Sequence, residues 1–150
     1  MPEQNSFFFV IFAIVVGFYL FDLVANMLNL SWLGRKLPAE FEDTFDPDDY
    51  ARSQAYTREG GRFELVGDSF QLLVFLLFWV CGGFAWVVGW AEAFGMAPVI
   101  TGLGVFSVLY LAQLLLSIPF DLFDTFVIEE KYGFNKTTPR TWIMDQLKGL

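Results

Sequence analysis

Three long apolar segments dominate the hydropathy pattern of this chain, and they are residues 7–30, 69–91 and 98–120. Each is about 23 residues long, which as an α-helix rising 1.5 Å per residue spans about 35 Å. The hydrocarbon core of a bilayer is about 30 Å thick, so each segment can cross it with some tilt. The first has no Lys or Arg before it and no A-x-A site after it, which argues against a cleaved signal peptide. We predict an all-α membrane protein with three transmembrane helices.

The first two apolar segments are joined by a polar loop, residues 31–68, that contains a helix start. Asp46 is suited to the N-cap and Pro47 to the first helical position. We expect this loop helix to run to about residue 59 and to stop at Gly60 and Gly61. Capping also accounts for most of an acidic cluster that lacks the spacing of a calcium-binding loop. Its members are Asp43, Asp46, Asp48 and Asp49.

A second helix start lies in the segment that follows the third apolar run, residues 121–150. Thr138 is suited to the N-cap, and Pro139 opens the helix. The apolar residues that share one face of it are Trp142, Ile143, Leu147 and Leu150. The pattern predicts an amphipathic helix of the interfacial kind. No signal beyond Gly149 ends it, so we expect the chain to continue in a longer parent protein.

Polar side chains form a stripe on the first and on the third apolar helix. At 100° per residue, each stripe falls within an arc of about 80°. The stripes are Tyr19, Asp22, Asn26 and Asn29 on the first helix, and Tyr110, Gln113, Ser117, Asp121 and Asp124 on the third. Ionisable groups in membrane segments turn toward a bundle interior or a water-filled cavity, so the stripes imply a wet or hydrogen-bonded interior, with a cavity beside Asp22, Asp121 and Asp124. The alternatives are interhelical hydrogen bonds for the Asn, Gln and Ser members, and bulk water for Asp124.

The distribution of Lys and Arg predicts the orientation of the chain, because cytoplasmic loops are enriched in these residues. None precedes residue 7, and none occurs in the short turn at residues 92–97. Nine are divided between the loop 31–68 and the segment 121–150. We therefore expect the N-terminus outside, with the loop and the C-terminal segment in the cytoplasm.

Composition narrows the chemistry that the chain can perform. Hydrophobic residues make up 55% and charged residues 17%, against about 25% charged residues in ordinary soluble domains. The formal net charge of −8, without a basic patch, argues against a nucleic-acid partner. The absence of histidine excludes a Ser-His-Asp triad and an HExxH zinc site. We assign no catalytic residue, metal ligand or cofactor to this chain itself.

The most specific stretch, residues 126–138, reads FVIEEKYGFNKTT. A helix stop at Gly133 and a cap at Thr138 explain only two of its residues. The block resembles the N-terminal membrane region of the type I CAAX prenyl endopeptidases, which are integral membrane zinc metallopeptidases with the pattern I-E-E-K-[FY]-G-F-N-K-x-T. The residues that carry this resemblance are Glu129, Glu130, Lys131, Gly133, Phe134, Asn135, Lys136 and Thr138.

Two further stretches extend the resemblance over about residues 37–150. Residues 145–148 are similar to a D-x-L-K-like element that follows the block in this family. The positions similar to the family's loop after the first helix are Leu37, Pro38, Tyr50, Ser53 and Tyr56.

The resemblance implies that the chain is part of a larger helical barrel around a water-filled chamber, which the two polar stripes would line. Zinc and the catalytic segments would lie in the rest of the parent metallopeptidase. It also implies two partners, which are the lipid bilayer and a peptide or prenylated-peptide substrate. The membrane would be the bacterial inner membrane or the endoplasmic reticulum. Two other hypotheses remain open: a non-catalytic membrane scaffold or adaptor, and an ion or proton transport component that uses Asp22, Asp121 and Asp124.

Overall fold

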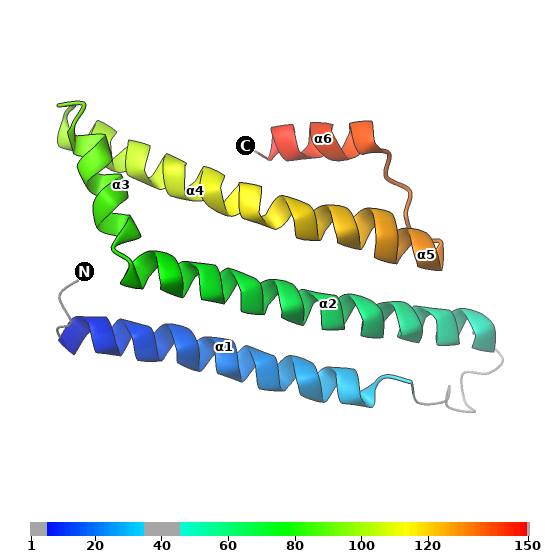
Figure 1. The fold of residues 1–150 in the computed structure, drawn as a ribbon. Coiled ribbons are helices and arrows are strands. Elements are labelled where there is room, and N and C mark those ends of the chain that lie inside the picture. Colours follow the sequence, from blue (N-terminus) through cyan, green and yellow to red (C-terminus); the bar gives the residue numbers. More distant parts are fainter. Residues whose placement is uncertain (1–5, 35–45, 150) are drawn as a thin grey trace.

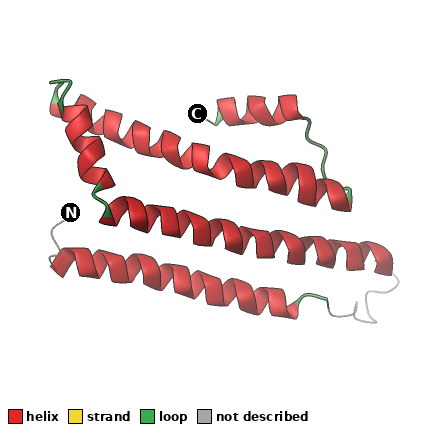
Figure 2. Ribbon diagram, in the orientation of Figure 1, coloured by secondary structure: helices red, strands yellow, loops and turns green. Residues whose placement is uncertain are grey.

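The computed structural model describes residues 6–34 and 46–149, and within these ranges every regular element is a helix (Figure 2). The elements, drawn in Figure 1, are α1 (Ser6–Trp32), α2 (Pro47–Val80), α3 (Gly83–Glu92), α4 (Pro98–Phe123), a π-helix η2 (Asp124–Glu129), α5 (Glu130–Tyr132) and α6 (Pro139–Lys148). Several residues used in the sequence interpretation lie outside the described ranges. They are Arg35, Lys36, Leu37, Pro38, Asp43 and Leu150.

Helix α2 begins where the sequence predicted a helix start and continues far beyond the predicted end. The Asp46 side chain accepts hydrogen bonds from the backbone N–H groups of Asp48 at 2.8 Å and Asp49 at 3.4 Å. The predicted stop at Gly60 and Gly61 is wrong, because α2 passes through both glycines to Val80. Thus the loop helix and the first part of the second apolar segment form one helix of 34 residues.

The glycines inside α2 allow close packing instead of ending the helix. A Cβ atom added at Gly61 would lie 2.7 Å from Leu30 Cδ2 of α1, and one added at Gly67 would lie 3.3 Å from Phe120 Cδ1 of α4. A glycine in a helix interior costs about 1 kcal/mol relative to alanine. The close packing of α1 against Gly61 and of α4 against Gly67 offsets that cost.

The second apolar segment, predicted as one helix over residues 69–91, is broken near its middle. Helix α2 ends at Val80, and Gly82 adopts a left-handed conformation with φ of 80° before α3 begins. The Phe78 ring occupies the space that a side chain at the next position, Gly83, would need. Two consecutive glycines therefore let the chain change direction where a side chain would not fit.

Helix α4 begins at Pro98, as predicted, and continues past Pro119. It runs directly into η2 and α5, and this long rod ends at Gly133, whose φ of 74° matches the predicted stop. The Thr138 side chain then accepts a hydrogen bond from the Thr141 N–H at 3.2 Å, as expected of an N-cap. Helix α6 follows and runs in the direction opposite to α4 (Figure 1), and Gly149 after it contacts Tyr110 of α4.

In the described part of the chain, three helical rods are long and apolar enough to cross a membrane: Ser6–Trp32, Pro47–Val80 and Pro98–Tyr132. Large apolar side chains cover their outer faces, and the exposed fraction reaches 67% for Phe18 and 74% for Phe106. The few buried side chains include Val87, Ala91 and Ile128. Water is a poor solvent for such a surface, so the fold suits a lipid environment and further protein contacts.

Candidate functional site

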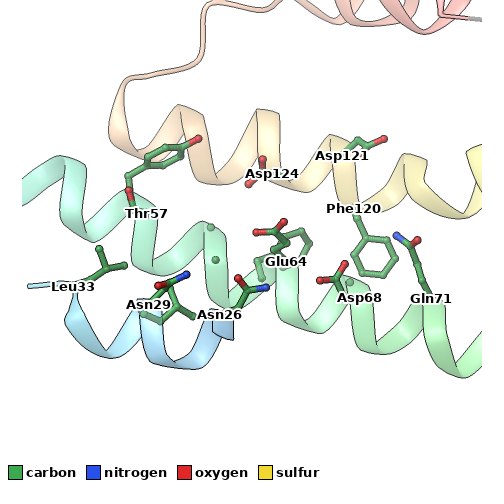
Figure 3. Close-up of a pocket in the computed structure, with 16 residues that line it drawn as sticks. Asn26, Asn29, Leu33, Thr57, Glu64, Asp68, Gln71, Phe120, Asp121 and Asp124 are labelled. Carbon is green, nitrogen blue, oxygen red and sulfur yellow. The ribbon is translucent and has the colours of Figure 1, made fainter. Parts of the chain in front are cut away.

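A groove with a volume of about 560 Å³ lies between α1, α2 and α4, toward the end of the bundle where α5 lies. We call this the Tyr132 end. The groove is lined by Asn26, Asn29, Leu30, Leu33, Tyr56, Thr57, Gly60, Gly61, Phe63, Glu64, Gly67, Asp68, Gln71, Phe120, Asp121 and Asp124. Figure 3 shows how these side chains are distributed over the three helices.

Four of the nine predicted chamber-lining residues line this groove. Asn26 and Asn29 contribute from α1, Asp121 from α4 and Asp124 from η2 (Figure 3). Members of both stripes line the same groove at the Tyr132 end, where α2 lies between α1 and the α4 rod. Their amide and carboxylate groups make this part of the bundle polar, although each comes from a helix of spanning length.

The other five predicted residues lie outside the groove, and four of them form hydrogen bonds. Tyr19 Oη lies 2.6 Å from Ser69 Oγ, and Gln113 donates to Gln71 Oε1 at 2.6 Å. Ser117 donates to Asp121 Oδ2 at 3.0 Å. Tyr110 donates to the Gly149 carbonyl of the segment after α6 at 3.4 Å. Asp22 is exposed on α1 and does not line the groove.

The sequence interpretation missed the contribution of α2 to this groove. Helix α2 contributes five polar side chains from a region that the sequence analysis assigned to a loop or to its border. They are Tyr56, Thr57, Glu64, Asp68 and Gln71. The signal was the spacing of positions 57, 60, 64, 67, 68 and 71, which share one helical face if the helix continues through the glycines. The groove contains four carboxylates, Glu64 and Asp68 of α2 with Asp121 and Asp124 of the α4 rod. No Lys or Arg belongs to the described lining of the groove.

The Glu129–Thr138 block packs against α2 at the Tyr132 end. Glu59 Oε2 accepts hydrogen bonds from Lys131 Nζ at 2.5 Å and from Tyr132 Oη at 2.6 Å. Arg58 of the same helix donates to the Leu33 carbonyl after α1. The charged side chains of the block therefore join helices that are distant in sequence.

Aromatic contacts support the same junction. Tyr56 Oη donates to Glu129 Oε1 at 3.4 Å, and its ring lies 5.9 Å from the ring of Tyr132 and 4.9 Å from that of Phe134. The guanidinium of Arg52 lies 5.6 Å from the centroid of the Phe134 ring, within the range of a cation–π contact. The block thus follows the surface of α2 from Arg52 to Glu59.

The remaining motif residues shape the turn itself. Asn135 Nδ2 donates to Glu130 Oε2 at 3.1 Å, and Asn135 Oδ1 accepts from the Thr137 N–H at 2.7 Å. Lys136 is exposed. These contacts explain why a carboxylate and an amide lie on either side of Gly133, which the sequence pattern left unexplained.

The donor set of this chain does not fit a zinc ion. The sequence contains no histidine and one cysteine. In the described residues, no group of three or more Cys, Asp or Glu side chains is arranged to hold a metal. Zinc in proteins is held mainly by histidine and cysteine, so the carboxylates and amides of the groove are a poor match for a zinc ion.

Most of this chain matches a known protein family. A family described as CAAX prenyl protease N-terminal, five membrane helices, matches residues 26–150. The chain belongs to the CAAX prenyl protease family. It is 35% identical over 149 residues to the probable CAAX prenyl protease 1 of Schizosaccharomyces pombe, with 90% of this chain and 31% of that protein covered. It is 30% identical over 127 residues to the CAAX prenyl protease 1 of Saccharomyces cerevisiae, covering 77% of this chain and 28% of that protein.

A solved structure supports the same assignment at the level of the fold. The crystal structure of S. mikatae Ste24p matches 99% of this chain and 36% of its own, with a TM-score of 0.81 and 26% sequence identity. The chain therefore spans about a third of the length of the CAAX prenyl proteases that it matches. It is an all-helical, integral membrane chain of the N-terminal region of this family.

Proposed function

We propose that this chain forms the N-terminal membrane part of a CAAX prenyl protease, and that its groove is part of the wall of a water-filled chamber for the peptide substrate. The observation that carries the proposal is the groove of about 560 Å³, in which polar groups from three helices of spanning length converge. The groove lies where the apolar segments end on the proposed cytoplasmic side, and its Asn26, Asn29 and Gln71 side chains belong to those segments. Such polar groups need water or a protein partner, because lipid cannot solvate them. A chamber open to water would meet this need along the whole groove.

The position of α6 supports a water-filled space beside α4. The last turn of this helix carries Asp145 and Lys148, and Gly149 after it contacts Tyr110, near the middle of the third apolar segment. Charged side chains at that depth are costly when they face lipid. A chamber that borders α4 would solvate them.

The remaining parts of the proposal follow from charge and family. The Lys and Arg distribution supports an N-terminus outside, with residues 31–68 and the Glu129–Thr138 block in the cytoplasm, in the endoplasmic reticulum or the bacterial inner membrane. A prenylated peptide is the proposed substrate, because the relatives are named CAAX prenyl proteases. We propose that zinc and the catalytic groups come from residues outside this chain.

The test compares two tryptophan variants of the complete native gene product, purified from membranes. Asn26→Trp fills the groove from α1, whereas Phe18→Trp changes a side chain of the same helix that is 67% exposed. We expect about one zinc per chain in both proteins. The rate of prenyl-peptide cleavage should fall about tenfold or more only in Asn26→Trp, since misplaced substrate loses rate steeply.

Two results would count against this proposal. A native product that contains no zinc and cleaves no peptide would favour a scaffold or adaptor. Equal rates in Asn26→Trp and Phe18→Trp would show that the groove does not contact the substrate.

A further inference from the structure

We propose that Glu59 is a positioning residue that holds the Tyr132 end of the α4 rod against α2 and thereby sets the width of the groove. The carboxylate accepts two charge-assisted hydrogen bonds, from Lys131 Nζ at 2.5 Å and Tyr132 Oη at 2.6 Å. The side chains are exposed, 39% for Glu59 and 56% for Lys131, so solvent weakens this ion pair, and the Tyr132 hydrogen bond adds to it. The inference rests on the proposed function, because it assigns a role in shaping the same groove.

Glu59 is placed to act on both walls of the groove. Its neighbours on α2, Thr57 and Gly60, belong to the lining, and Asp124 faces them from the other wall. Asp124 and Lys131 lie on one continuous helical rod formed by η2 and α5. A contact that fixes Lys131 therefore also fixes the distance of Asp124 from α2.

At this level Glu59 acts together with side-chain packing, because the Tyr56 ring contacts the rings of Tyr132 and Phe134 and Ile128 of η2 is buried. Gly60 presents no side chain to the opposite wall, and a Cβ atom added there would lie 3.9 Å from Asp124 Oδ1. Apolar ring contacts between α2 and α4 occur farther from the Tyr132 end. The centroid of the Phe63 ring lies 4.6 Å from that of Phe123 and 5.8 Å from that of Phe120. Beyond these rings, the hydrogen bonds of Glu59 add a polar attachment between α2 and α5.

The ion pair of Glu59 differs in kind from the other ion pairs of the described residues. Arg52–Asp49 and Lys148–Asp145 each join two residues three apart on one helix. Glu59 and Lys131 are 72 residues apart and join α2 to α5. Among the described ion pairs, this one alone can hold two helices together.

The test uses the complete native gene product with its native cysteines replaced, so that introduced cysteines report alone. Spin labels at Ala55→Cys on α2 and Val127→Cys on η2 measure the separation of the two rods. A single cysteine at Asn29→Cys, in a parallel set of variants, measures the accessibility of the groove to a water-soluble maleimide. Both readouts are compared in Glu59→Ala, in the exchanged pair Glu59→Lys with Lys131→Glu, and in Asp49→Asn, which breaks an ion pair within α2.

We expect Glu59→Ala to broaden and lengthen the spin-label distance and to change the maleimide rate roughly two- to fivefold, as the strength of an exposed ion pair allows. The exchanged pair should restore both values, and Asp49→Asn should leave both unchanged. An unchanged distance and rate in Glu59→Ala, or no restoration in the exchanged pair, would overturn the inference. A cysteine at Asn29 that never reacts would instead contradict the proposed chamber, while the spin-label distance would still test Glu59.

Discussion

Replacing Ile128 with alanine is expected to lower the free energy of unfolding by about 2–5 kcal/mol, the range for truncating a fully buried aliphatic side chain. Ile128 is 1% exposed and is the most buried large side chain of the described residues. It lies in η2, where the rod of α4 meets α2 and α5. The alanine variant would leave a cavity at the junction that supports the Glu129–Thr138 block.

The matched control is Val127→Ala, one residue earlier in the same π-helix, where the side chain is 46% exposed. Its effect should stay within about 1 kcal/mol, because little packing is lost at an exposed position. Unfolding of the purified protein in mixed micelles, followed by circular dichroism as denaturing detergent is added, measures both values. Equal losses for the two variants would contradict the packing described for η2.

Replacing Gly67 with leucine is expected to lower the free energy of unfolding by about 1–3 kcal/mol through overpacking. A Cβ atom at this buried glycine would lie 3.3 Å from Phe120, whose ring also packs 5.8 Å from Phe63 and 5.3 Å from Phe70. The larger side chain must displace this aromatic cluster and move α4 away from α2.

Gly17→Leu is the control, since no side chain or other helix lies within 4 Å of a Cβ added there. Leucine forms helices better than glycine, so stability should stay the same or rise by up to about 1 kcal/mol. The same detergent titration compares the two variants. If Gly67→Leu is as stable as Gly17→Leu, α2 and α4 are not in close contact at Gly67.

Much of the fold could be predicted from the sequence because long apolar segments and helix caps are local signals. Asp46, Pro98, Gly133 and Thr138 all mark helix ends at the predicted positions. The error at Gly60 and Gly61 has a different origin. A glycine pair ends a helix in isolation, whereas in the folded chain neighbouring helices occupy the space that the missing side chains leave.

The site could be predicted only in part for the same reason. The two polar stripes were visible from periodicity, and four of their residues line the groove. The contribution of α2, including Glu64 and Asp68, depended on recognising one continuous helix through Gly60 and Gly61. The contacts of Glu59 with Lys131 and Tyr132 join residues more than 70 positions apart, and no local pattern contains that information.

The most direct test of the central claim is the reaction of single cysteines with a membrane-impermeant maleimide in sealed vesicles of both orientations. Cysteines at Asn26 and Asp121 report on the groove, and cysteines at Phe18 and Phe106 report on exposed apolar faces of the same two rods. Cys81, the one cysteine of this chain, is replaced by serine in every variant. If the groove faces a water-filled chamber, the cysteines at Asn26 and Asp121 react from the cytoplasmic side, and those at Phe18 and Phe106 stay unreactive. Unreactive groove cysteines, or equal reaction at all four positions, would contradict the account.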